Sequence, residues 1–178
     1  MTDQPAIDIL FSADEIARRV ESLAREIAAD HPDDLLVVVI LKGSFVFAAD
    51  LIRALERAGA SPHVDFITLA SYGTARQSSG AVSLTHDLTE DVAGRHVLLV
   101  DDILESGRTL AFARDTLAGR GAASVRTCLL LDKPDQRKMA VEADYVGFRI
   151  GPEFVVGYGL DLAHRYRGLG YIGVLRGG

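Results

Sequence analysis

Residues 97–109 read VLLVDDILESGRT, and this stretch decides how the chain folds around its site. An apolar run typical of a buried strand ends in two adjacent acids, Asp101 and Asp102. A short loop with Ser106 and Gly107 then leads into a helical pattern that begins at Thr109. Backbone N–H groups at the start of a helix have no partner inside the helix, so they bind anions. The stretch therefore predicts a strand, a loop and a helix that together hold a phosphate, a divalent metal and a sugar.

The composition predicts a single globular domain. A chain of 178 residues is long enough for one domain and too short for two, and its 48 % hydrophobic and 25 % charged residues are ordinary for a globular protein. The formal net charge of −6 argues against a protein that coats nucleic acid. The lone cysteine, Cys128, lies in an apolar run and is expected to be a small buried residue in a reducing compartment.

Neither a signal peptide nor a membrane span is expected. The first residues, MTDQPAIDIL, lack a basic region and a long apolar core. The longest apolar run, residues 35–41, is too short to cross a bilayer. We therefore expect a cytoplasmic protein with no membrane partner.

Strand and helix patterns alternate along the chain. Residues 12–15 form a capping box, and the unbroken apolar run over 35–41 indicates a central strand covered on both faces. A helix with Phe47, Leu51 and Leu55 on one side follows it. Further strands are predicted at 64–70, 81–85, 96–100, 124–131, 145–150 and 154–158, a helix at 109–119, and a mobile loop at 71–80, where SYGTARQSSG has no periodicity. The fold class is α/β, with an open, mostly parallel sheet flanked by helices.

Polar residues follow three of the predicted strands at their carboxyl ends. They are the pairs Lys42-Gly43, Asp101-Asp102 and Asp132-Lys133. Ligands of open α/β sheets bind beyond these strand ends, so we expect the three pairs to converge. The chain has no GxxxxGK[ST] string, and the GxG at 157–159 lacks its third glycine because Leu162 stands there. A Walker loop and a dinucleotide-binding domain are therefore not expected.

The string VDDILESGRT resembles the ribose-phosphate-binding signature of the type I phosphoribosyltransferases. Strings similar to those of the hypoxanthine-guanine members recur at Lys42-Gly43, Ser71-Tyr72, 131–134 (LDKP), 154–161 (FVVGYGLD) and Arg167. The resemblance covers nearly the whole stretch 35–174. It implies the type I phosphoribosyltransferase fold in a single domain, 1–178, with a core of roughly 33–150. A small hood over the base site would come from the termini, roughly 1–12 and 150–178.

The same resemblance implies an activity. Enzymes of this kind are glycosyltransferases (pentosyltransferases) of purine salvage that move a phosphoribosyl group from 5-phosphoribosyl 1-pyrophosphate to N9 of hypoxanthine or guanine. The products are IMP or GMP and pyrophosphate. The resemblance also implies Mg²⁺ as cofactor, a homodimer or homotetramer, and no nucleic-acid partner. Two alternatives stay open: an enzyme that prefers xanthine, and a regulator that keeps the fold and binds RNA.

Roles for individual residues follow from the resemblance. The residues expected to bind phosphoribosyl pyrophosphate are Lys42, Gly43, Asp101, Asp102, Ser106, Gly107, Arg108, Thr109 and Arg167. Asp101, Asp102 and Asp161 are expected to hold Mg²⁺, which prefers oxygen ligands. Ser71 and Tyr72 are expected on a lid that closes over the reaction, and a cis peptide is expected at Lys42–Gly43.

Three residues are expected at the purine: Lys133 at O6, Phe154 stacked on the ring, and Val155 with its backbone at the edge of the base. An ammonium group only donates, so Lys133 would favour a 6-oxo group and disfavour the 6-amino group of adenine. Glu105 stands where the family usually has an aspartate that acts as acid and base toward N7. Its carboxylate can take that role, but its reach is one methylene longer.

Overall fold

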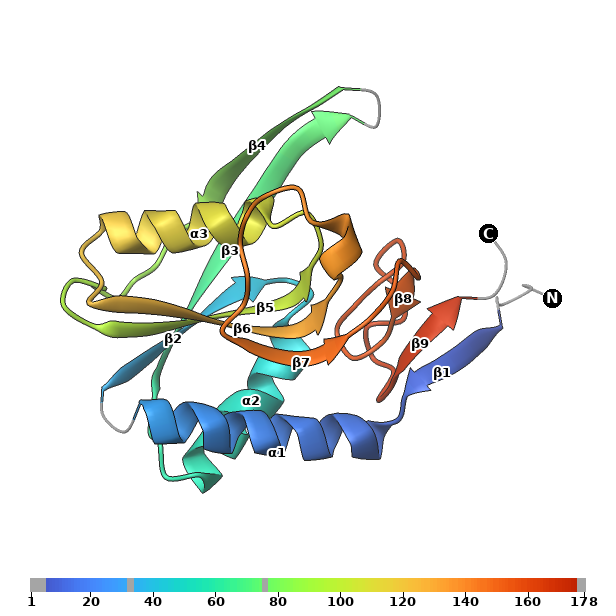
Figure 1. Cartoon of the computed structure of the whole chain (residues 1–178), viewed down its shortest axis with the longest axis horizontal. Coiled ribbons are helices and arrows are strands. Elements are labelled where there is room, and N and C mark those ends of the chain that lie inside the picture. Colours follow the sequence, from blue (N-terminus) through green and yellow to red (C-terminus); the bar gives the residue numbers. More distant parts are fainter. Residues whose placement is uncertain (1–5, 32–33, 75–76, 176–178) are drawn as a thin grey trace.

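A six-stranded sheet in the order β4-β3-β2-β5-β6-β7 forms the centre of the chain in a computed structural model, which describes residues 6–31, 34–74 and 77–175 (Figure 1). Its strands are β2 (Leu35–Leu41), β3 (His63–Thr74), β4 (Gln77–His86), β5 (His96–Leu104), β6 (Ser124–Asp132) and β7 (Tyr145–Arg149). The strand pairs are parallel except β3 with β4, which is antiparallel. The predicted α/β class with a mostly parallel sheet is confirmed.

Helices cover both faces of this sheet. The helices α1 (Ala13–Asp30) and α2 (Phe45–Arg57) lie on one face and α3 (Arg108–Gly119) on the other (Figure 1). Alternate residues of β2 serve the two sides: Val37 and Val39 pack with α1 and α2, whereas Leu36 and Val38 pack with α3. This double cover explains why β2 is apolar at every position. In the described part of the chain, no helix is long and apolar enough to cross a membrane.

A second, smaller sheet lies beside the carboxyl ends of the central strands (Figure 1). It has the order β1-β9-β8 and pairs β1 (Ile7–Phe11), β9 (Ile172–Leu175) and β8 (Val155–Val156) in antiparallel fashion. Strands β1 and β9 are not predicted from the sequence, and β8 is shorter than the strand predicted at 154–158. The small sheet joins both ends of the described chain and carries Val155 toward the site.

The loop expected over residues 71–80 is wrong for the described positions. Strand β3 continues to Thr74 and strand β4 begins at Gln77, so the two form a hairpin that projects beyond the sheet (Figure 1). Antiparallel pairing holds it together, with Tyr72 opposite Ala81 and Thr74 opposite Gln77. Backbone hydrogen bonds make these strands and need no apolar alternation, so the polar composition concealed them.

Candidate active site

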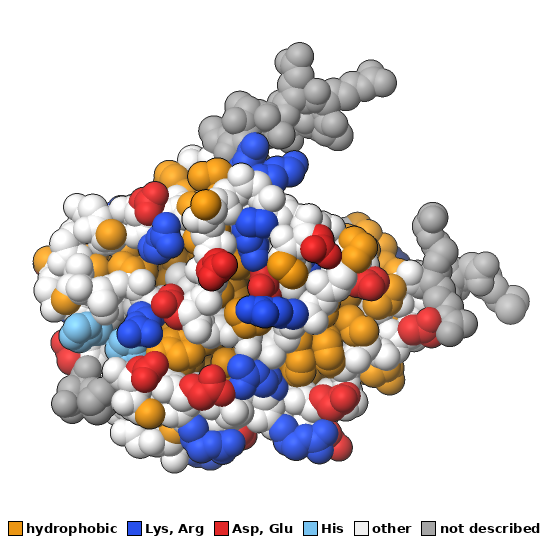
Figure 2. All heavy atoms as spheres, viewed as in Figure 1, with side chains coloured by type: hydrophobic (Ala, Val, Ile, Leu, Met, Phe, Trp, Pro, Cys, Tyr) orange, Lys and Arg blue, Asp and Glu red, His pale blue; other side chains and the backbone are white. Residues whose placement is uncertain are grey.

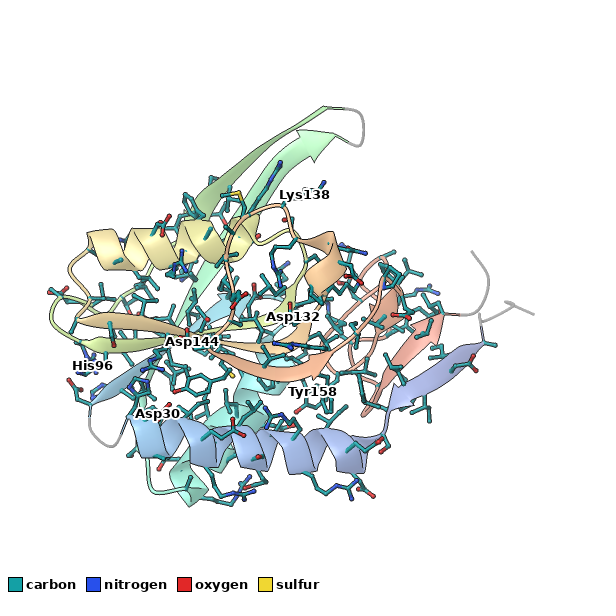
Figure 3. The ribbon with its side chains drawn as sticks, viewed as in Figure 1. Asp30, His96, Asp132, Lys138, Asp144 and Tyr158 are labelled. Atoms are coloured by element: carbon teal, nitrogen blue, oxygen red, sulfur yellow. The ribbon has the colours of Figure 1, made fainter. Side chains whose placement is uncertain are left out.

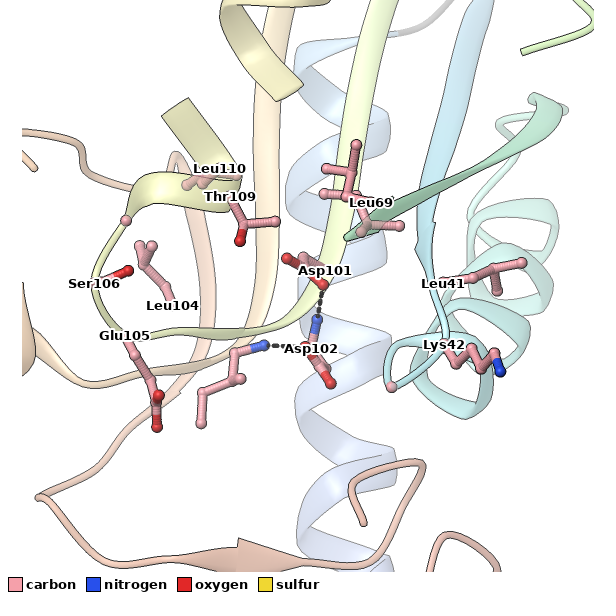
Figure 4. Close-up of a pocket in the computed structure, with 14 residues that line it drawn as sticks. Leu41, Lys42, Leu69, Asp101, Asp102, Leu104, Glu105, Ser106, Thr109 and Leu110 are labelled. Atoms are coloured by element: carbon pink, nitrogen blue, oxygen red, sulfur yellow. Dashed lines mark hydrogen bonds between the residues drawn. The ribbon is translucent and has the colours of Figure 1, made fainter. Parts of the chain in front are cut away.

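Two adjoining cavities lie at the carboxyl ends of the central strands. One has a volume of about 300 Å³ and the other about 440 Å³, sizes that suit small molecules. They share Leu41, Lys42, Gly43, Leu69, Asp102, Ile103 and Glu105. The first adds the loop between β5 and α3 (Figure 4), and the second adds Lys133, Phe154, Val155, Leu160, Asp161 and Arg167. The predicted convergence of polar pairs is therefore present for Lys42-Gly43, Asp101-Asp102 and Lys133.

The loop of the first cavity presents the start of α3 to the open space. Gly107 has φ +83°, the left-handed region that favours glycine, and a Cβ there would lie 2.5 Å from Val141 Cγ1. Its carbonyl accepts the first helical bond, from Ala111 N at 2.9 Å. Ser106, Gly107 and Thr109 line the cavity, whereas Arg108 lines neither cavity. The loop can therefore bind an anion through the first helical amides, without the Arg108 side chain.

The two adjacent aspartates differ in exposure, since Asp101 is buried and Asp102 is half-buried. Asp101 Oδ1 accepts from Asp102 N at 2.9 Å, and Asp102 Oδ1 accepts from Ile103 N at 2.8 Å (Figure 4). Burial raises the pKa of Asp101, and the neighbouring Asp102 carboxylate raises it further. Burial also raises the pKa of Asp102. Asp101 and Asp102 have no ion-pair partner among the described residues, so they fit a divalent cation, which would compensate their charge.

Asp161 does not join this pair in a single group. Its Oδ1 lies 2.7 Å from Arg167 Nη2, and its Oδ2 accepts from His164 N at 2.7 Å. Over residues 6–31, 34–74 and 77–175, no three histidine, cysteine or acidic side chains are arranged to hold a metal ion. A Mg²⁺ ion commonly takes only one or two carboxylates and completes its shell with water and substrate phosphates, and Asp101-Asp102 suits that arrangement.

The connection after β2 brings Gly43 against Asp102. A Cβ at Gly43 would lie 1.6 Å from Asp102 Oδ2 and 2.7 Å from its Cγ, so any larger residue there would displace the Asp102 carboxylate. The cis peptide lies between Leu41 and Lys42, one bond before the predicted one. That prediction was wrong because a similar string locates the residues of a turn but not the bond within it. Lys42 is exposed, and its side chain points away from the two aspartates (Figure 4).

Lys133 and Glu105 form an ion pair with each other. Lys133 Nζ lies 2.6 Å from Glu105 Oε1, and its side chain is only 5 % exposed, against 47 % for Glu105. A lysine is rarely this buried without an acidic partner. The sequence predicts separate roles for the two residues at one ligand, and the structure joins them across 28 positions of sequence.

The remaining predicted residues surround the second cavity. Phe154 is 54 % exposed at its edge, and Val155 is buried in β8. Arg167 Nη1 donates to Gly159 O at 2.6 Å, so its guanidinium is held by both that carbonyl and Asp161. Ser71 lies in β3 with Tyr72, and their side chains are outside the described part of the structure.

Arg137 was missed by the sequence analysis. It pairs with the buried Asp132 and donates from Nη1 to Glu105 O at 2.8 Å. Nothing in the pattern around Arg137 marks it, because it follows a strand end among other polar residues. One signal could have pointed to Arg137: Asp132 precedes Lys133 at the end of a buried strand, and a buried carboxylate needs a charged or hydrogen-bonding partner.

Charges of both signs alternate on the outer face. On the face drawn in Figure 2, lysine and arginine side chains are interspersed with aspartate and glutamate, over α1 and above it. A protein that binds nucleic acid usually gathers its basic residues into a patch or stripe. That face carries no such stripe.

Known proteins share both the sequence and the fold. The phosphoribosyl transferase domain family matches residues 7–162. A hypoxanthine phosphoribosyltransferase of Haemophilus influenzae is 43 % identical over 171 residues, 94 % of this chain and 94 % of that protein. The bifunctional protein TilS/HprT of Listeria innocua is 47 % identical over 169 residues, which are 94 % of this chain, but the chain spans only 26 % of that protein. A solved Trypanosoma cruzi hypoxanthine phosphoribosyl transferase has a TM-score of 0.92 and 38 % identity, and the match covers 99 % of this chain and 94 % of that one.

Proposed function

This chain belongs to the phosphoribosyltransferase family, and we propose that it transfers a phosphoribosyl group from phosphoribosyl pyrophosphate to N9 of hypoxanthine or guanine. The products are IMP or GMP and pyrophosphate, and the place of the enzyme is purine salvage. One observation carries the proposal: the second cavity combines a buried lysine, an exposed aromatic ring and an arginine–aspartate pair. That set suits a flat base with an acceptor at its edge, next to an anionic sugar.

Lys133 is proposed to select the 6-oxo group. Its ammonium donates to Glu105 and has further N–H bonds for O6 of the base. Adenine would present an amino group, donor against donor, and leave a buried ammonium without an acceptor. Phe154, exposed beside the cavity, would stack on the ring, and the backbone of Val155 would contact its edge.

The phosphoribosyl group is proposed to lie across both cavities. The amides and hydroxyls of residues 106–109 would bind its 5′-phosphate, and Lys42, Gly43 and Arg167 would hold the pyrophosphate. Asp101 and Asp102 would bind the ribose hydroxyls and Mg²⁺, and Asp161 would join the metal site as Arg167 turns to the pyrophosphate. Mg²⁺, when bound, supplies positive charge that balances the leaving pyrophosphate.

Glu105 is proposed to manage the proton of the base. Its carboxylate faces the second cavity and contacts Lys133, so it can accept a proton from the purine as the new bond forms. Such proton transfer contributes about 10²- to 10⁴-fold in rate. The β3–β4 hairpin with Ser71 and Tyr72 is proposed as the lid, and a homodimer or homotetramer in the cytoplasm as the working form.

A steady-state assay with phosphoribosyl pyrophosphate, Mg²⁺ and each of hypoxanthine, guanine, xanthine and adenine tests the proposal. We expect turnover of hypoxanthine and guanine, and kcat/KM for adenine lower by about 10⁴-fold. A Lys133→Met variant should lose about 10- to 100-fold in kcat/KM for hypoxanthine, because a charged hydrogen bond is removed. Lys138→Met, at an exposed position, is the matched control.

Each outcome has a separate meaning. Failure to turn over any of the four bases would contradict the proposed activity. Equal kcat/KM for adenine and hypoxanthine would contradict the role of Lys133 alone. A marked preference for xanthine would point to the xanthine-preferring alternative, which the relatives do not favour.

A further inference from the structure

We propose that Arg137 is a positioning residue that holds Glu105 in place for proton transfer at the purine, an inference that rests on the proposed function. The guanidinium of Arg137 donates from Nη1 to the backbone oxygen of Glu105 at 2.8 Å and pairs through Nη2 with Asp132. Arg137 lines neither cavity of the site. It therefore acts through Glu105 and does not touch the substrate.

Asp132 binds the other end of the Arg137 guanidinium, so that Arg137 forms a bridge between Asp132 and Glu105. Asp132 is the last residue of β6 and lies where the loop that carries Lys138 departs (Figure 3). Its side chain is 9 % exposed, and a buried carboxylate requires a charged or hydrogen-bonding partner. The planar guanidinium presents donors in a fixed fork, so one arginine can bind two acceptors in a defined geometry. Asp132 thus fixes Arg137, and Arg137 fixes Glu105.

The segment 133–139 donates hydrogen bonds to three successive carbonyls at the end of β5 and just after it, those of Leu104, Glu105 and Ser106. Lys133 N donates to Leu104 O at 2.9 Å, and the amides of Lys138 and Met139 donate to Ser106 O at 3.0 Å each. Arg137 supplies the contact to the residue between them, Glu105, and it is the side-chain donor of the set. Without Arg137, Glu105 would be the one residue of the three whose carbonyl accepts no hydrogen bond from this segment.

The orientation of this carbonyl also sets the next amide. In a trans peptide the C=O and the following N–H point in opposite directions. Because the oxygen of Glu105 points toward Arg137, the N–H of Ser106 points away from the 133–139 segment. Ser106 lines the first cavity, where an anion is proposed to bind.

The Glu105 carboxylate itself is lightly held. It is 47 % exposed, and Lys133 Nζ is its hydrogen-bond partner among the described residues. The direction in which the Glu105 carboxylate points therefore depends on the backbone conformation of Glu105. Lys133 follows Asp132 directly in the chain, so one strand end sets both partners of the ion pair: Lys133 through the peptide bond and Glu105 through Arg137.

An Arg137→Gln variant tests the bridge. We expect kcat with hypoxanthine to fall about 10- to 100-fold, the loss that a displacement near 1 Å at a reacting group produces. KM for hypoxanthine should stay close to that of the wild type, because Arg137 makes no contact with the cavity. The kcat of Arg137→Lys should also fall, since an ammonium group cannot bind both acceptors in the same geometry. Arg149→Gln is the matched control: Arg149 Nε lies 3.7 Å from Asp132 Oδ2, but Arg149 is 78 % exposed and is not bonded to Glu105.

A double-mutant cycle separates positioning from a general loss of structure. In a Glu105→Gln background, where the group to be positioned cannot take a proton, Arg137→Gln should lower kcat little further. Equal loss of kcat in both backgrounds would overturn the proposal. So would wild-type kcat in Arg137→Gln while the wild-type enzyme turns over hypoxanthine, whereas an inactive wild type would count against the proposed function instead.

A second variant covers the case in which Arg137→Gln folds poorly because the buried Asp132 loses its closer ion pair and keeps only the exposed Arg149 at 3.7 Å. The double variant Asp132→Asn, Arg137→Gln removes both charges together, which is much less costly than breaking the pair. We expect it to unfold at nearly the wild-type temperature and to keep the low kcat of Arg137→Gln. Wild-type kcat in this folded double variant would overturn the positioning role.

Discussion

At the scale of single residues, Glu105 stands where the resemblance to the family implies an aspartate. Its carboxylate lies 2.6 Å from Nζ of Lys133, which is almost completely buried. The two groups proposed to meet the O6 and N7 edge of the base are thus already joined before a base arrives. A purine that binds them must share this ion pair or open it.

Shortening and neutralising Glu105 should have different effects. Glu105→Gln cannot take a proton, so we expect kcat to fall about 10²- to 10⁴-fold. Glu105→Asp keeps the acid but withdraws it from Lys133, and a fall of about 10-fold is expected. Single-turnover and steady-state kinetics with hypoxanthine measure both. An unchanged kcat in Glu105→Asp would mean that the loop absorbs the methylene.

The sequence predicts which residues line the cavities, but it does not predict the contacts between their side chains. Glu105, Lys133, Asp101 and Asp102 could be found because strand ends and a family signature mark them. The ion pair between Glu105 and Lys133 depends on side-chain lengths and on the distance between two strands. The bridge through Arg137 depends on a loop fold that no periodicity encodes.

At the scale of elements, the unit formed by β5, its loop and α3 is shaped by Gly107. Its φ of +83° and the nearby Val141 side chain leave no room for a Cβ without a shift. The bend lets the first turn of α3 face the cavity lined by Ser106 and Thr109. The quality of this anion site therefore depends on a single backbone conformation.

Gly107→Ala should weaken both the fold and the binding of phosphoribosyl pyrophosphate. We expect the free energy of unfolding to fall by about 1–3 kcal/mol, from the strained φ and the contact with Val141. KM for phosphoribosyl pyrophosphate should rise more than KM for hypoxanthine. Urea unfolding and initial rates measure these changes.

The control for that variant lies in the same helix. Gly119 has no atom within 4 Å of an added Cβ, so Gly119→Ala should leave both KM values unchanged and stability equal or slightly higher. Equal effects of the two substitutions on KM for phosphoribosyl pyrophosphate would contradict the role given to Gly107.

The elements differ in how well the sequence predicted them. β2, α1 and α3 follow from apolar runs, helical periodicity and a capping box, which Ser12 and Glu15 do form. Local patterns do not predict the arms of the β3–β4 hairpin or the strands β1 and β9. These strands are short or polar, and they form because their backbones pair with other strands. Ile7 lies opposite Leu175, a contact that local patterns cannot reveal.

At the scale of the whole molecule, titratable groups lie at both ends of the sheet. Asp132 lies at the carboxyl end of β6, whereas the exposed residues Asp30, His96 and Asp144 lie toward the opposite end of the sheet (Figure 3). His31, at the C-cap of α1, is buried there, with its ring centre 6.1 Å from that of His96. Its Nε2 has no hydrogen-bond partner in the described structure.

His31 should make the fold sensitive to acid. Burial lowers the pKa of His31, and Arg126 lowers it further, while Asp30 and Asp144 oppose the shift. The folded state thus binds fewer protons than the unfolded state, so the free energy of unfolding falls as the pH drops below about 6.5. Urea unfolding at several pH values should show a smaller loss in His31→Gln than in the wild type. His164→Gln, at a position 86 % exposed, should keep the wild-type dependence; the same slope in all three proteins would contradict this prediction.

The small sheet also fixes the order in which the enzyme is completed during synthesis. The central sheet can assemble once β7 has left the ribosome, but β8 pairs only with β9 within its sheet, and β1 waits for β9 as well. Val155 therefore reaches its final position only after Ile172–Leu175 has emerged. A nascent chain would hold the loop between β5 and α3 beside an unfinished second cavity, and the proposed transfer would begin only once β9 has paired with β8.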